Sequence, residues 1–166
     1  MKNLLVLFMF FNSGLFAGDT QLNDVRLLFQ KSIIDEATCK NLIAVLNQYN
    51  ESDNTTLAAY RACANMMMAN YCFNPFSKLS YFNEGKSLLE KCIAKESSNI
   101  ETRYLRFTVQ SSSPDFLGYN KSIQEDKDFL LKHLSNLIDQ QLKQMIISFL
   151  KSSQYLSSIK KQNLKS

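Results

Sequence analysis

Two arginines carry the clearest candidate chemistry in this chain. Arg103 and Arg106 are three residues apart, so a helix there places both guanidinium groups on one face. A guanidinium pair can hold a carboxylate or a phosphate through bidentate hydrogen bonds. Tyr104 is expected beside the pair, as are Phe116 and Tyr119 from the apolar loop that follows. These five residues form the candidate contact site for a ligand or a partner.

The same arginines have an alternative, structural role. One or both can form ion pairs that fasten the loop to the helices, with Glu84, Glu101 or Asp115 as the carboxylate. We favour the ion-paired arrangement. If the chain has a ligand site, however, this face is where the sequence predicts it.

No pattern of residues indicates catalysis. His133 is the single histidine, and a serine or cysteine nucleophile would need it nearby as a base, together with a third group to orient it. The adjacent carboxylates Asp35 with Glu36, and Glu125 with Asp126, point about 100 degrees apart on a helix and do not converge on one substrate. We therefore expect neither an enzyme nor a cofactor.

The cysteines are Cys39, Cys63, Cys72 and Cys92. An even number permits disulfides in an oxidising compartment, and the sequence cannot choose among the three pairings. Cys92 lies on an apolar stripe and Cys63 lies among alanines, which favours buried thiols over a disulfide. No two cysteines are two to four residues apart, so no metal site is predicted.

Three consecutive methionines, Met66 to Met68, allow two interpretations. Flexible, polarisable side chains can line an adaptable binding groove. Three consecutive methionines nevertheless point to sides that together cover almost a full helical turn. A helix buried between two others needs apolar residues on all of those sides. The core interpretation is favoured.

Apolar residues recur at helical spacing through most of the chain. Glycine and proline are scarce, at 4 and 2 residues, which favours long helices over a sheet with many tight turns. The expected helices cover residues 19–29, 34–49, 55–71, 79–95, 99–110, 122–134 and 137–149.

Polar residues mark where several of these helices should begin. Asp53 or Thr55 is the expected N-cap of the third helix. Ser98 with Glu101 predicts a capping box for the fifth helix, and Ser122 with Glu125 predicts another for the sixth.

The first residues read as a secretory leader. Lys2 precedes the apolar run Leu4 to Phe11, and the small pair Ala17 and Gly18 follows. The run is too short to span a membrane comfortably. The sequence therefore predicts a signal peptide over 1–17, one helical domain over 18–150 and a polar, basic tail over 151–166 that should fray, with no stable membrane span once the leader is removed.

The charge balance argues against a nucleic-acid partner. The chain has 19 basic and 15 acidic residues. Only Lys2 lies in the leader, so the mature protein would carry 18 minus 15, or +3. Charges of both signs alternate along the predicted helices, which is typical of solvated faces and not of a concentrated basic surface.

Residues 82–107 resemble the second helix of a tetratricopeptide repeat followed by the first helix of the next. Phe82 lies three residues before the small residue Gly85, and Cys92 occupies the next small-residue position, seven residues later. Lys95–Asn99 stands where the repeat has its interhelical turn. The resemblance implies stacked hairpins that recognise a peptide or protein partner on a helical groove.

An internal pattern also supports pairing the helices as hairpins. The order apolar, polar, Glu recurs from Ile34, Phe82 and Ile123. The separations, 48 and 41 residues, exceed the 34 of an undecorated tetratricopeptide unit, so longer helices and loops are needed. The sequence thus predicts an all-α fold of about seven helices stacked as three antiparallel hairpins.

The segments NPFSKLSYF, RYLRF and FLGYN resemble a group of short exported bacterial proteins. That resemblance implies export to the periplasm or exterior of a Gram-negative bacterium, and no particular activity. The predicted function is therefore a binding or structural module for a peptide or protein. The alternative is a carrier of a small anionic ligand, or a small enzyme, that uses the Arg103 and Arg106 face.

Overall fold

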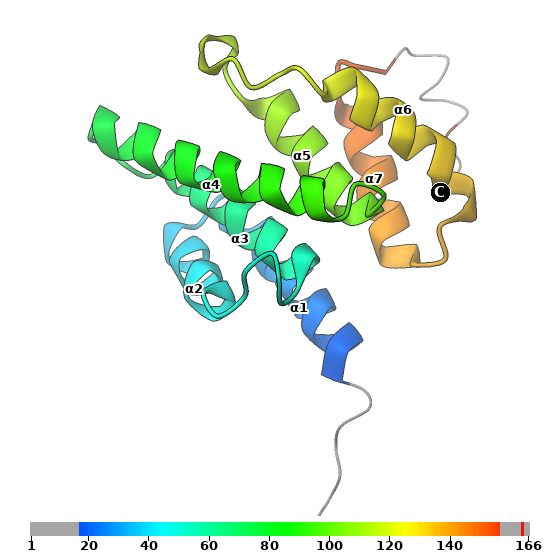
Figure 1. The fold of residues 1–166 in the computed structure, drawn as a ribbon, viewed down its shortest axis with the longest axis horizontal. Coiled ribbons are helices and arrows are strands. Elements are labelled where there is room, and N and C mark those ends of the chain that lie inside the picture. Colours follow the sequence, from blue (N-terminus) through cyan, green and yellow to red (C-terminus); the bar gives the residue numbers. More distant parts are fainter. Residues whose placement is uncertain (1–16, 157–163, 165–166) are drawn as a thin grey trace, which may run out of the picture.

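The computed structural model describes residues 17–156 and residue 164, and these residues contain helices and no strand, which confirms the all-α prediction. All of the predicted leader except Ala17 lies outside them. The helices, shown in Figure 1, are α1 (Ala17–Ser32), α2 (Glu36–Leu46), α3 (Thr55–Met68), α4 (Pro75–Lys95), α5 (Ile100–Ser112), α6 (Ile123–His133) and α7 (Gln140–Ser152), with 3-10 turns η1 (Asp115–Leu117) and η2 (Leu134–Asn136).

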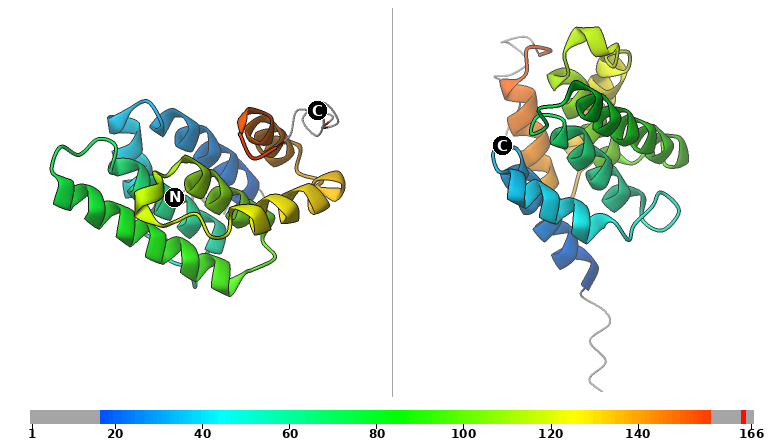
Figure 2. Two further views of the ribbon diagram at one scale, coloured as in Figure 1. Left: turned by 90° about the horizontal axis from the view of Figure 1, so that it is seen from above. Right: turned by 90° about the vertical axis from the view of Figure 1, so that its left-hand side faces the viewer.

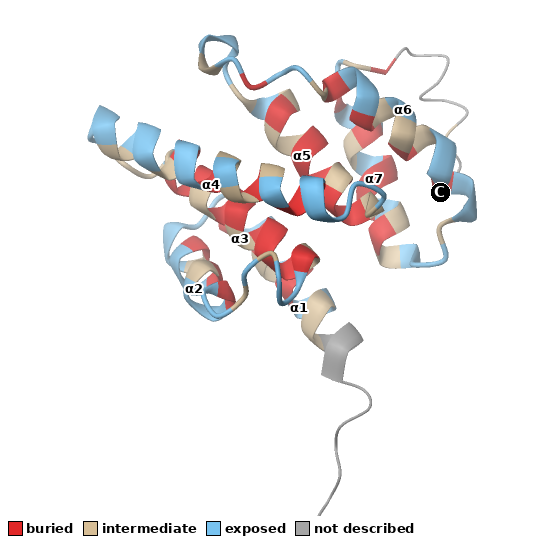
Figure 3. Cartoon of the chain, in the orientation of Figure 1, coloured by how far each residue is buried: buried red, intermediate tan, exposed pale blue. Residues whose placement is uncertain are grey.

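The longest helix, α4, lies across the middle of the molecule and packs most extensively against α3, which runs antiparallel to it (Figure 1). Helices α1, α3, α5 and α7 contact one another in succession, while α2, α4 and α6 each pack against the helix that precedes them. Figure 2 shows the same arrangement from two further directions. The buried residues lie on the helix faces that meet one another, most densely along α3 and α5 (Figure 3). No helix among the described residues is long and apolar enough to cross a membrane.

Gly85 is where α3 and α4 approach most closely. A Cβ atom there would lie 2.4 Å from the backbone oxygen of Ala62 and 2.6 Å from Cγ of Met66. Gly85, the small residue of the predicted repeat-like pattern, is therefore required by the close packing of α3 against α4. Substitution of Gly85 by alanine should lower the free energy of unfolding by about 1–3 kcal/mol, because the backbone of α3 cannot yield without separating the helices. Urea denaturation measures this loss.

The matched control for Gly85→Ala is Ser87→Ala, at an exposed position on the same helix. We expect this control to stay close to wild type. Equal stability of the two variants would show that the two helices have room to separate.

The N-caps of α3 and α5 are asparagines next to the predicted residues, whereas Ser122 is the N-cap of α6 as predicted. Asn54 caps α3, and its side chain accepts a hydrogen bond from the amide of Leu57 at 3.0 Å. Asn99 caps α5 in the same way, whereas Ser122 forms no side-chain cap at all. Both predicted capping boxes are therefore wrong, because Glu101 and Glu125 bind arginines instead of helix ends.

Helix α4 begins one turn earlier than predicted, at Pro75, and α3 ends earlier, at Met68. Pro75 is suited to begin a helix, because its ring fixes φ near the helical value. It occupies the first turn of α4, where a missing N–H costs nothing, and Asn74 accepts hydrogen bonds from the amides of Phe76 and Ser77. The extra turn adds Phe76 and neighbouring residues to the protein surface.

The described part of the C-terminal tail packs on the domain. Leu156 is buried, and the ring of Tyr155 lies edge-on to Phe107 with centroids 6.2 Å apart. Leu164 is also packed against the core. Apolar residues spaced through this polar segment are sufficient to hold it there.

All four cysteines are free thiols. Cys39, Cys63 and Cys92 are buried and Cys72 is half-buried. Burial raises the pKa of Cys39 and of Cys92 to about 11, and it raises the pKa of Cys63 as well. These three residues act as small apolar side chains, as predicted.

Candidate functional site

The two predicted arginines lie together on α5 and bind carboxylates. Both Nε and Nη2 of Arg106 donate to Asp126, at 2.7 and 2.8 Å, and the Asp126 side chain is fully buried. Nη1 of Arg103 donates to the same carboxylate at 2.9 Å and also pairs with Glu125. Helix α6 is thereby fastened to α5.

Other donors of this cluster are occupied as well. Arg106 Nη1 donates to Glu90 at 3.2 Å, and Tyr119 donates to the other oxygen of Glu90 at 2.6 Å. Arg103 Nε donates to the carbonyl of Ser97 at 2.7 Å. Burial opposes the charge of Arg106, but the hydrogen bonds from its guanidinium to Asp126 and Glu90 outweigh that effect and raise its pKa.

Ion pairing of the arginines was predicted, but with different partners. None of Glu84, Glu101 and Asp115 pairs with Arg103 or Arg106. The true partners come from α4 and α6, which lie beside α5 only after folding.

A second buried cluster was not predicted. Arg26 on α1 is 1 % exposed and donates from Nε and Nη2 to the two oxygens of Glu101, at 2.7 Å each. Tyr60 donates to Glu101 at 2.6 Å, and Asp139 accepts from Arg26 at 2.7 Å. The available signal was a single arginine beside Val25 in an otherwise apolar helix face. This cluster joins α1, α3 and α5 to the start of α7.

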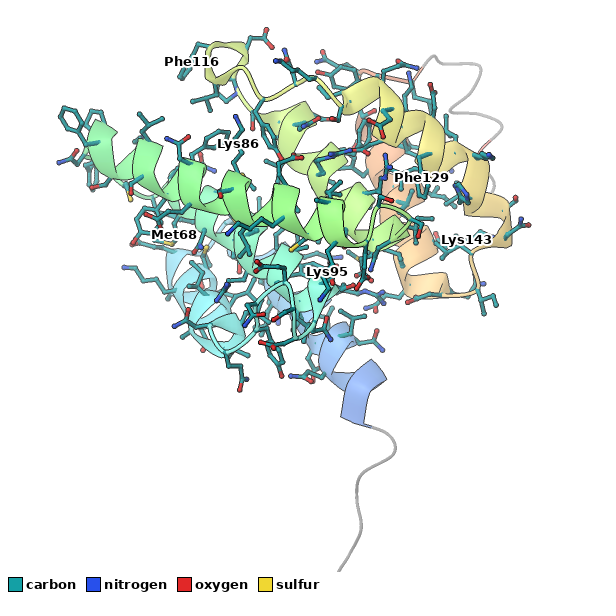
Figure 4. The ribbon with its side chains drawn as sticks, in the orientation of Figure 1. Met68, Lys86, Lys95, Phe116, Phe129 and Lys143 are labelled. Carbon is teal, nitrogen blue, oxygen red and sulfur yellow. The ribbon has the colours of Figure 1, made fainter. Side chains whose placement is uncertain are left out.

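The described residues also form an apolar groove of about 650 Å³. Its lining comes from the C-terminal ends of α1, α3 and α5, the N-terminal half of α4, the turn η1 and part of α7. Representative lining residues are Phe29, Leu79, Tyr104 and Val109. Phe116 of η1, labelled in Figure 4, projects from the upper edge toward the start of α4. We call this feature the apolar groove.

The five predicted contact residues therefore divide between two places. Arg103, Arg106 and Tyr119 belong to the ion-pair cluster. Tyr104 and Phe116 instead line the apolar groove. The ion-pair cluster and the apolar groove are adjacent, because the ring of Tyr119 packs edge-on to the groove residue Phe82.

The methionines combine both predicted interpretations. Met66 and Met68 are buried in the core, while Met66 and the half-buried Met67 also line the groove. Met145 of α7 joins them there. Such side chains can adapt to apolar groups of different shapes.

Large apolar side chains are exposed in the groove and near the start of α4. Phe116 lines the groove and is 86 % exposed, while Phe76 and Phe73, 84 % and 100 % exposed, lie beside the lining residue Pro75 in the sequence and outside the lining itself. Exposed apolar side chains that form a patch are typical of interaction sites. Apart from the methionine run, nothing in the sequence indicated the groove, because its walls come from distant segments.

A smaller hollow of about 340 Å³ lies at the loop before α3 and the end of α4. Its lining is polar, and those groups already bind one another: Thr55 donates to Glu96, and Lys95 donates to the carbonyl of Glu51 at 2.6 Å. It serves as a hydrogen-bonded link between loops.

Comparison with known proteins adds no assignment, since no family model, no curated protein and no solved structure matches the chain.

Proposed function

We propose that the protein is a binding module whose apolar groove receives apolar side chains of a peptide or a partner protein. The observation that carries the proposal is the groove together with Phe116, which is exposed in its lining, and with Phe73 and Phe76, which are exposed on either side of the lining residue Pro75 in the sequence. A small ligand confined to the apolar groove would leave Phe73 and Phe76 in water, whereas a peptide or protein surface can cover them.

The tetratricopeptide-like stacking and the export of the chain belong to the same proposal. The successive contacts of α1, α3 and α5, with α2, α4 and α6 paired against them, support the resemblance of three stacked hairpins. The apolar run near the N-terminus supports export to the periplasm or exterior of a Gram-negative cell.

The alternative function at Arg103 and Arg106 lacks a favourable observation. A ligand anion would have to displace Asp126, whose carboxylate is buried between both guanidinium groups. We therefore place recognition in the groove and not on the arginine face.

The proposal is tested with a synthetic peptide helix that carries leucine and phenylalanine on one face and glutamine and serine on the other. The double variant Leu79→Gln, Phe116→Gln should bind it at least about tenfold more weakly than wild type, because two apolar contacts are lost. Both residues are exposed, so the fold should be retained. Fluorescence anisotropy of a labelled peptide measures the affinity.

The matched control is Val45→Gln, on α2, which is exposed and lies outside the groove. Its affinity should equal that of wild type. The proposal fails if wild type does not bind the peptide, or if the double variant and the control bind it equally.

A further inference from the structure

We infer that the partner segment is an amphipathic helix with acidic residues beside its apolar face. This inference rests on the proposed function and specifies the chemistry of the occupant. It draws on the charges along α4, on the absence of a strand edge, and on the position of the exposed phenylalanines.

The charge in the groove is positive. Among the described residues that line it, Lys78 is the only charged one. Its side chain is exposed and forms no ion pair or hydrogen bond with another described residue. A carboxylate on a bound partner would therefore meet a cation that no protein group already neutralises.

A second lysine continues the same face of α4. Pro75, Lys78, Leu79 and Phe82 line the groove, and Lys86 follows at the helical spacing of that row. In Figure 4 the Lys86 side chain projects from α4 toward the segment that carries Phe116, and its ammonium lies 5.0 Å from the ring centroid of Tyr119. The two lysine positions are about 12 Å apart along the helix.

The acidic residue of this part of α4 lies on the opposite face. Glu84 accepts a hydrogen bond from Ser80 at 2.7 Å, and both positions are turned well away from the row of Lys78 and Phe82. The face of α4 that lines the groove thus carries lysines at two positions, and the carboxylate that follows on that row, Glu90, accepts hydrogen bonds from Arg106 and Tyr119. A partner with acidic residues at matching spacing is complementary to the two lysines.

A helix suits the groove better than an extended peptide. The described residues offer no strand edge with which an extended backbone can pair, and the lining is mostly apolar. An extended peptide would bury backbone N–H and C=O groups against apolar side chains without hydrogen-bond partners, which costs free energy. A helix forms these hydrogen bonds within itself. A helix, about 10–12 Å in diameter with its side chains, also presents a broad apolar face to the lining residues Leu79 and Phe116.

The test uses the full chain and three peptide helices with the same leucine and phenylalanine face. Their flanking positions carry glutamate, glutamine or lysine. We expect the acidic peptide to bind about threefold to tenfold more tightly than the neutral one at low salt, and the basic peptide to bind most weakly. Circular dichroism of the mixture should show the bound peptide to be helical.

Lys78→Glu should reverse the order of the three peptides. The control Lys91→Glu changes an exposed lysine on the far face of the same helix and should leave the order unchanged. Equal affinity for all three peptides, or a bound peptide that is not helical, overturns the inference while the neutral peptide still supports the proposed function. Binding of none of the peptides overturns both, as does binding to phospholipid vesicles in their place.

Discussion

Replacing Arg26 by methionine is expected to lower the free energy of unfolding by about 3–5 kcal/mol. The guanidinium donates two hydrogen bonds of 2.7 Å to Glu101, a residue that is 5 % exposed. Without Arg26, that charge stays buried with only the Tyr60 hydroxyl, 2.6 Å away, to stabilise it. The pKa of Tyr60 is raised, first by burial and then by Glu101, so the hydroxyl stays protonated and offers Glu101 a neutral hydrogen bond but no positive charge. Urea denaturation followed by circular dichroism measures the loss.

A second substitution shows whether the buried charge is the cause. The double variant Arg26→Met, Glu101→Gln should recover part of the stability, because a neutral amide is less costly to bury than an unpaired carboxylate. Lys40→Met, which removes an exposed ion pair with Glu36, should have little effect. If Arg26→Met is as stable as Lys40→Met, Arg26 does not hold the helices together.

Replacing Asp126 by alanine should cost a similar amount, about 3–5 kcal/mol. Asp126 is fully buried and accepts hydrogen bonds from both Arg103 and Arg106. Its removal leaves two cations close together, one of them buried, and detaches the start of α6 from α5. Thermal or urea unfolding measures the change.

The comparison variant for Asp126→Ala is Glu125→Ala. Glu125 pairs with Arg103, but its side chain is mostly exposed, so solvent screens most of its contribution. We expect this variant to lose far less stability than Asp126→Ala. Similar stabilities for the two would mean that Arg103 and Arg106 are not committed to a structural role, and the anionic-ligand site would regain support.

The helices were predictable because local spacing determines them. The stripe of Leu88, Leu89, Cys92 and Ile93 identified α4, and the residues with least exposure in that stretch, Leu89 and Cys92, lie on it. Helix ends were less predictable. Several polar residues near each start can serve as the N-cap, and only the folded backbone shows that Asn99 and not Ser98 occupies that position.

The site was only partly predictable for a related reason. The spacing of Arg103 and Arg106 places them on one face, but their partners lie on other helices and depend on packing. The groove depends on packing still more. Leu79 and Val109 are ordinary apolar residues of two separate helices, and nothing local in the sequence indicates that they face one hollow. The run of Met66 to Met68 was the local signal of a groove, and Met66 and Met67 line it.

The central claim, recognition in the apolar groove, is tested most directly by the methyl resonances of methionine. Met66, Met67 and Met145 line the groove, whereas Met68 is buried outside its lining. With selectively labelled methyl groups, titration with the acidic peptide helix should shift the first three signals in a saturable way and leave that of Met68 nearly unchanged. Absent or non-saturable shifts, or changes confined to Met68, would contradict binding in this groove.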